Sequence, residues 1–215
     1  MHFVLFLLVT SAVAARTTTV EPTTAPAACT AFPSSVREFS SQFQQPEPPL
    51  VKNQFKTSFI QHKWNQNLSH IIAGYLYNSP SQKLVRGDEA FDGGLATSIF
   101  NYTNVTDTGM VDNTMTTFSN ASAAPEVWRG YVDSNYPLFG EDFLIQNEAV
   151  FGGLVRRDFI DGYVASWDLM YQGTVPVTVY VDSCNVIVGY DYFAPGLRTR
   201  VITMFFDIYI GPVTI

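Results

Sequence analysis

The side chains best suited to acid–base chemistry are three close pairs of carboxylates. These pairs are Asp88 with Glu89, Glu141 with Asp142, and Asp158 with Asp161. A glycoside hydrolase needs two carboxyl groups that face one cleft, roughly 5 to 10 Å apart. Asp158 and Asp161 are the nearest candidates, but their odd spacing on a regular strand would point them to opposite faces of a sheet. A carboxylate-dependent glycan hydrolase is therefore an alternative function, not the favoured one.

The histidines and the acidic turn give weak support for a metal site. His62 and His70 have no cysteine or carboxylate near them in the sequence to complete a zinc ligand set, so we interpret them as surface loop residues. Asp88, Glu89 and Asp92 precede a Gly-Gly pair but do not match the calcium-binding loop pattern. A solvated acidic turn is the favoured interpretation, with weak calcium binding as the alternative. No other cofactor is expected.

The sequence lacks the motifs of common enzyme classes. It has no GxSxG nucleophile elbow, no HExxH zinc helix, no phosphate-binding loop and no dinucleotide fingerprint. A nucleophilic Cys184 would need a histidine partner. In an oxidising compartment two cysteines usually pair, so a disulfide between Cys29 and Cys184 is expected instead. The chain is predicted to be non-enzymatic.

The first residues indicate secretion. An apolar run at positions 3–9 is too short to span a bilayer and is followed by small residues that end at Ala14 and Ala15. Residues 1–15 are therefore predicted to be a cleaved signal peptide. The net charge of −7 argues against nucleic acid or an anionic membrane as a partner. No later segment is long and apolar enough to span a membrane.

Four N-glycosylation sequons support an extracellular location. They begin at Asn67, Asn101, Asn104 and Asn120. Three of them lie in the polar stretch 101–124, which we interpret as a solvated loop. At least one sequon is expected to carry a glycan.

Alternation with a period of two predicts the elements that must position any site. Val175, Val177, Val179 and Val181 alternate with less apolar residues, and 163–171 alternates just before them, so the two runs predict a hairpin around Gly173. Further strands are predicted at 55–61, 71–77, 83–86, 96–102, 142–146, 186–193 and 201–210. Short helices are expected within 33–44 or 123–132. The class is all-β and mostly antiparallel, as a sandwich, a barrel or a curved sheet.

The chain is predicted to hold one folded domain. Residues 16–50 are rich in Thr and Pro and are interpreted as a mostly disordered leader. Residues 51–215 are long enough to bury a full hydrophobic core.

Several segments resemble those of ependymin-related secreted proteins. Residues 74–77, a polar turn and residues 82–88 resemble the family's hairpin, in which a tyrosine strand is followed by a hydrophobic strand with an arginine. Trp167, the Cys184-Asn185 turn and the closing run 201–211 (VITMFFDIYIG) are similar as well. The resemblance implies the fold shared with bacterial lipoprotein carriers of the LolA type. That fold is a single, strongly curved antiparallel sheet, or half-barrel, with few short helices around an apolar cavity.

The resemblance also implies a secreted glycoprotein that binds a hydrophobic ligand, and in some relatives calcium. Inward-facing side chains would then line a pocket for a lipid or acyl chain, namely Trp64, Tyr75, Tyr77, Trp167, Leu169, Val177 and Val179. The alternative is that these residues pack an ordinary core. An extracellular matrix or adhesion protein without a small ligand is a further alternative. An exposed edge strand would allow a homodimer.

Overall fold

One antiparallel sheet of eleven strands makes up the fold in the computed structural model, which describes residues 29–37, 44–65, 67, 69–119 and 124–215. The strand order is β6-β5-β4-β3-β2-β1-β11-β10-β9-β8-β7. The strands are β1 Phe55–Trp64, β2 Ser69–Ser79, β3 Leu84–Phe91, β4 Gly94–Val105, β5 Val111–Ser119, β6 Glu126–Val132, β7 Val150–Val155, β8 Val164–Tyr171, β9 Val175–Val181, β10 Ile187–Ala194 and β11 Thr199–Ile210. Because β6 and β7 are the two edges, the sheet is not closed into a barrel.

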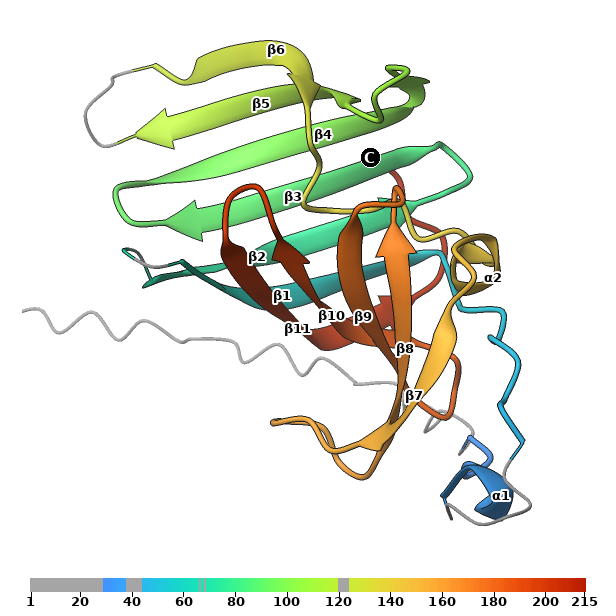
Figure 1. Cartoon of the computed structure of the whole chain (residues 1–215). Helices are drawn as coiled ribbons and strands as arrows, with labels where there is room; N and C mark the ends of the chain where they lie inside the picture. Colours follow the sequence, from blue (N-terminus) through green and yellow to red (C-terminus); the bar gives the residue numbers. More distant parts are fainter. Residues whose placement is uncertain (1–28, 38–43, 66, 68, 120–123) are drawn as a thin grey trace, which may run out of the picture.

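The sheet bends so strongly that its two arms face each other, with β8 to β10 lying across from β2 to β5 (Figure 1). Alternate side chains of each strand point into the space between the arms, as the period of two predicts. Leu76 and Val85 are buried on one arm, and Leu169 and Val179 on the other. The predicted fold class, all-β with a single curved antiparallel sheet, is confirmed.

The connection from β6 to β7 fills much of the space between the arms. It runs across the concave face to the short helix α2 (Phe143–Gln146) and then to β7 (Figure 1). Tyr136, Phe139 and Phe143 of this connection are buried, and the Phe139 ring lies 5.0 Å from Phe143 and 5.7 Å from Tyr190 between ring centroids. This connection, residues 133–149, is called here the plug, because it fills the deep part of the half-barrel.

A buried amide holds this plug to the sheet. The Nδ2 group of Asn78 donates to the carbonyl oxygens of Asn53, at 2.6 Å, and of Phe139, at 2.9 Å. In return the backbone N–H of Phe139 donates to Oδ1 of Asn78 at 3.1 Å. Asn78 is fully buried, so each of these polar groups would lack water as a substitute partner.

Three predicted elements are wrong. Within the predicted strand 142–146, Phe143–Gln146 form α2 instead, where the N–H groups of Gln146 and Asn147 donate to the carbonyl oxygens four residues earlier. The stretch 101–124, interpreted as a loop, contains the end of β4 and all of β5, whose β-branched threonines fit a pleated surface. Residues 126–132 form β6 instead of a helix, and β7 was not predicted.

Other local predictions agree with the structure. The hairpin between β8 and β9 turns through Gly173, whose φ is +70°. A disulfide joins Cys29 to Cys184, which lies in the turn between β9 and β10. The short helix α1 (Ser34–Arg37) falls within the predicted 33–44. The signal peptide at 1–15 and most of the leader lie outside the described residues.

No helix in the described part of the chain is long and apolar enough to cross a membrane.

Candidate ligand-binding site

A cavity of about 520 Å³ opens at the end of the half-barrel that the plug leaves free. It lies between residues 133–137 of the plug and the hairpin ends of β8 to β11. Apolar parts of six residues form much of its wall: Phe143, Tyr171, Val177, Tyr192, Leu197 and Val201. Its volume falls within the roughly 300 to 1,000 Å³ of typical small-molecule sites.

The strand register explains why these side chains meet. Lys63 of β1 lies opposite Val201 of β11, Val201 opposite Tyr192 of β10, and Tyr192 opposite Val177 of β9. Residues directly opposite one another in an antiparallel sheet point to the same face. One cross-strand row, called here the cavity row, therefore runs through Lys63, Val201, Tyr192 and Val177. It has a cationic end and an apolar end.

Two tyrosines tie the plug to the cavity wall. Tyr190 donates its hydroxyl hydrogen to the carbonyl oxygen of Asn135 at 2.6 Å, and Tyr192 donates to Oδ1 of Asn135 at 2.8 Å. The two rings are nearly parallel, with centroids 6.3 Å apart. Burial raises the pKa of both hydroxyls above the ordinary value of a tyrosine. They therefore stay protonated and keep donating across the physiological pH range.

Lys63 is a half-buried cation on the cavity wall. Burial lowers its pKa, and the nearby carboxylate of Glu89 opposes that effect. Glu89 itself accepts a hydrogen bond from the Tyr136 hydroxyl at 2.6 Å. Among the described residues, ion pairs within 4.0 Å join Arg86 to Asp88 and Arg157 to Asp191, and neither includes Lys63.

Four of the predicted pocket residues lie on the concave face, but only Val177 lines the cavity. Trp167, Leu169 and Val179 are buried in the core. The indole of Trp167 is 3% exposed and packs edge-on against Phe151, with centroids 5.4 Å apart. For these three residues the structure agrees with the packed-core alternative.

The other three predicted pocket residues lie on the outer face, so the prediction that they face inward is wrong. Tyr75 and Tyr77 flank Leu76, which is buried, and Tyr75 is 58% exposed. The Arg86 guanidinium lies 5.2 Å from the centre of the Tyr77 ring. Trp64 follows Lys63 and therefore points to the opposite face, beside His62 and Arg200.

Sequence reasoning missed most of the cavity. Tyr190 and Tyr192 alternate in a run predicted as a strand, so their shared face was recognisable, but which face is concave was not. Phe143 and Asn135 come from the plug, and Leu197 comes from the turn between β10 and β11. No local pattern indicates that these segments meet, because their approach depends on the curvature of the whole sheet.

The histidines and the acidic turn differ from their sequence interpretation. His62 and His70 lie on β1 and β2, not in loops, and Nδ1 of His70 is buried without a hydrogen-bond partner. Asp88 and Glu89 are neighbours on β3 and point to opposite faces, where Asp88 accepts from Arg86 and Glu89 from Tyr136. Asp88 and Glu89 therefore cannot bind one calcium ion together, as the alternative interpretation of the acidic turn would require.

The carboxylate pair of the hydrolase alternative has no catalytic geometry. Asp158 and Asp161 are exposed in the connection between β7 and β8. Neither is desolvated or placed in the cavity, as a general acid with a raised pKa would need to be.

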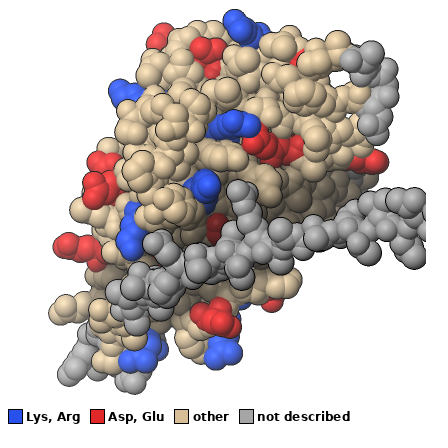
Figure 2. All heavy atoms as spheres, turned by 180° about the vertical axis from the view of Figure 1, so that it is seen from behind, with Lys and Arg blue, Asp and Glu red and all other residues tan. Residues whose placement is uncertain are grey.

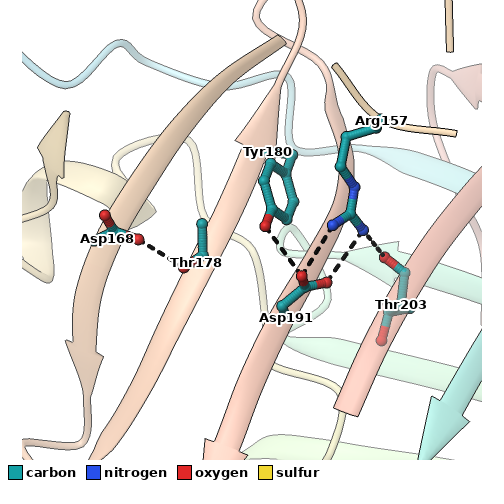
Figure 3. A network of polar contacts seen from close by, with 6 residues as sticks. All are labelled: Arg157, Asp168, Thr178, Tyr180, Asp191 and Thr203. Atoms are coloured by element: carbon teal, nitrogen blue, oxygen red, sulfur yellow. Dashed lines mark hydrogen bonds and ion pairs between the residues drawn. The ribbon is translucent and has the colours of Figure 1, made fainter. Parts of the chain in front are cut away.

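A polar network on the outer face of this arm involves side chains of β8, β9 and β10 and Arg157 of the segment after β7 (Figure 3). The Arg157 guanidinium donates to both carboxylate oxygens of Asp191, at 2.9 and 3.1 Å, and lies 3.9 Å from the centre of the Tyr180 ring. Tyr180 donates to the same carboxylate at 3.0 Å, and burial raises the pKa of Tyr180 to about 12. Asp168 accepts from Thr178 on the next strand at 2.6 Å. Because these groups satisfy one another, the network serves to fasten the segment after β7 to the sheet.

The asparagines of three of the four sequons lie among the described residues. Asn67 and Asn104 are exposed, and Asn101 is half-buried within β4. Oδ1 of Asn104 accepts a hydrogen bond from the Tyr131 hydroxyl at 3.0 Å. Asn120 lies outside the described residues.

Seen from behind, the surface has interspersed acidic and basic side chains and no dominant patch of one sign (Figure 2).

Comparisons with known proteins leave the family open. No protein-family model and no curated protein matches the sequence. Among solved structures, the chain is similar to a DUF1329 family protein from Desulfovibrio piger, with 12% identity, a TM-score of 0.33, and coverage of 74% of this chain and 86% of that one. It is also similar to a domain from Vibrio parahaemolyticus named for outer membrane lipoprotein sorting, with 9% identity, a TM-score of 0.32, and coverage of 75% and 86%. A relation to ependymins is not shown. The class of the protein, an open all-β half-barrel with an internal plug, rests on its own strand order.

Proposed function

We propose that this chain is a secreted, glycosylated, non-enzymatic protein that binds a lipid or another hydrophobic small molecule at the open end of its half-barrel. The observation that carries the proposal is the cavity of about 520 Å³, whose wall includes several aromatic and aliphatic side chains beside polar ones. Removing apolar ligand surface from water contributes roughly 25 cal/mol per Å². An acyl chain or a flat hydrophobe in this space would gain affinity mainly from that term.

The plug restricts where such a ligand binds. Tyr136, Phe139 and Leu144 already occupy the deep part of the half-barrel and are less than 2% exposed. The ligand is therefore held at the open end, between β8 to β11 and residues 133–137, and not along the whole concave face. Polar residues such as Lys63 and Asn135 border the same cavity, which suits a molecule with one polar end.

Filling the cavity tests the proposal. Ala194 of β10 lines the cavity, and Ala194→Trp would occupy space needed by the ligand. Ala73→Trp is the matched control, because Ala73 is exposed on the outer face of β2. Dye displacement and native mass spectrometry of delipidated protein should show at least about a tenfold loss of affinity for Ala194→Trp, equal to roughly 1.4 kcal/mol. The control should bind as the wild type does.

The proposal fails if wild-type protein binds neither dye nor lipid, or if the two tryptophan variants bind equally well. A homodimer through the free edges β6 and β7 remains a prediction, and sedimentation of the purified chain tests it.

A further inference from the structure

The cationic end of the cavity row is the feature that suggests which lipids the site would select. Lys63 lines the cavity, and its neighbours along the row are Val201, Tyr192 and Val177. A ligand that lies along this row meets an ammonium group at one end and apolar surface over the rest of its length. This inference rests on the proposed function.

The ammonium of Lys63 lacks a close anionic partner among the described residues. Both ion pairs within 4.0 Å involve arginines, and the carboxylate of Glu89 is hydrogen-bonded to Tyr136. An ammonium in partly apolar surroundings is poorly compensated unless an anion approaches it. The lowered pKa of Lys63 agrees with this, since its first cause is burial and the opposing effect of Glu89 is smaller.

A second polar group lies beside Lys63. His70 of β2 is directly opposite Lys63 in the strand register, and its Nδ1 is buried without a hydrogen-bond partner. His70 does not line the cavity, so Lys63 is the residue of this pair that a bound ligand would meet.

We infer that the cavity selects long-chain carboxylic acids, with the carboxylate on the Lys63 ammonium and the hydrocarbon chain along Val201, Tyr192 and Val177. A charge-assisted hydrogen bond is about twice as strong as a neutral one and favours a carboxylate over an alcohol. A cationic head would be repelled by Lys63. Asp133 and Glu89 are the acidic groups near this end, and neither is placed against the ammonium at ion-pair distance.

Three probes of equal chain length test the inference on the delipidated full chain: dodecanoate, dodecanol and dodecylamine. Calorimetry should show that wild-type protein binds the acid about tenfold or more tightly than the alcohol, and the amine most weakly. Lys63→Met should lose that preference while its affinity for dodecanol stays within about twofold. Lys63→Arg should keep the preference, because it preserves the charge.

Lys56→Met is the matched control, because Lys56 lies on the same strand and on the outer face, with its ammonium 5.3 Å from the centre of the Tyr209 ring. It removes the same charge without touching the cavity. Three results would each overturn the inference and leave hydrophobic binding intact. They are equal binding of acid and alcohol by the wild type, tighter binding of the amine, and an acid preference that survives Lys63→Met. Binding of none of the three probes would overturn the proposed function as well. If Lys63→Met does not fold, the wild-type ranking and Lys63→Arg still decide the question.

Discussion

At the scale of single residues, position on one face or the other decides what each aromatic side chain does. Trp64 and Tyr75 have the chemistry of pocket residues but lie on the outer face. Tyr192 has the same chemistry and lines the cavity. A strand's alternation shows which residues share a face, whereas only the direction of sheet curvature shows which face encloses space.

A substitution at Trp167 tests whether this residue packs the hydrophobic core or lines the ligand cavity. It is 3% exposed and does not line the cavity, so Trp167→Ala should lower the free energy of unfolding by about 3 to 5 kcal/mol. Dodecanoate affinity of the folded fraction should not change. Trp128→Ala is the control, because Trp128 on edge strand β6 is 44% exposed, and it should cost about 1 kcal/mol or less. Urea unfolding measures both, and a small loss for Trp167→Ala together with weakened binding would assign this residue to the ligand site.

The sequons give a prediction at the same scale. Asn67 and Asn104 are exposed, so a eukaryotic secretory host should attach glycan to at least one of the four sequons. Digestion with an N-glycosidase should then lower the apparent mass. Asn67→Gln and Asn104→Gln, singly and together, would assign the sites by peptide mass spectrometry. An unshifted band from that host would contradict the predicted glycosylation.

At the scale of elements, the sequence predicts strands correctly where one face of the strand is buried. It fails where tertiary contacts determine the conformation of a segment. The valines of β9 and the Phe205 region of β11 alternate so regularly that their strands were predicted within a few residues. β5 has polar and β-branched residues on both faces and was interpreted as a loop. The plug has no period at all, and its shape depends on Asn78 and on the aromatic rings it meets.

The role of Asn78 in holding the plug can be tested by a single substitution. Asn78→Ala would leave the Phe139 N–H and two carbonyl oxygens without their partners in a buried place. Because a buried unsatisfied group costs about 1 to 3 kcal/mol, we expect a total loss of roughly 2 to 5 kcal/mol. Hydrogen exchange should speed up selectively in residues 134–149. The control is Asn101→Ala, at a half-buried position of β4, which should do neither. Equal exchange in both variants would show that Asn78 does not hold the plug.

At the scale of the whole molecule, one curved sheet combines a solid core with an open end. The plug packs between the arms, and the cavity lies beyond Phe143, which belongs both to the core and to the cavity wall. The sequence resemblance predicted the curved sheet but not the plug. The predicted pocket and the observed cavity share only Val177, because three of the predicted residues lie on the outer face and three are buried in the core.

The tyrosines of this interior predict how the whole protein responds to alkali. Burial raises the pKa of Tyr102, Tyr136, Tyr190 and Tyr192 above the ordinary tyrosine value of about 10. In the unfolded chain these hydroxyls lose their protons near pH 10, whereas in the folded chain they keep them. Their contribution to stability is therefore fully present below pH 10 and is lost as the pH rises above it, by about 1.4 kcal/mol per pH unit for each such tyrosine.

The pKa shift of Lys63 changes stability with pH in the opposite direction, and this determines the pH range in which the tyrosines should be measured. Its pKa is lowered from 10.5, so the unfolded chain binds more protons below that value and stability rises with pH until then. Urea unfolding from about pH 11 to pH 12 therefore isolates the tyrosines. Tyr136→Phe should reduce the slope there by about 1.4 kcal/mol per pH unit, although it also removes the hydrogen bond to Glu89 and lowers stability at pH 7. The exposed Tyr75→Phe is the control, and an unchanged slope in Tyr136→Phe would mean that this hydroxyl ionises as readily in the folded protein as in the unfolded chain.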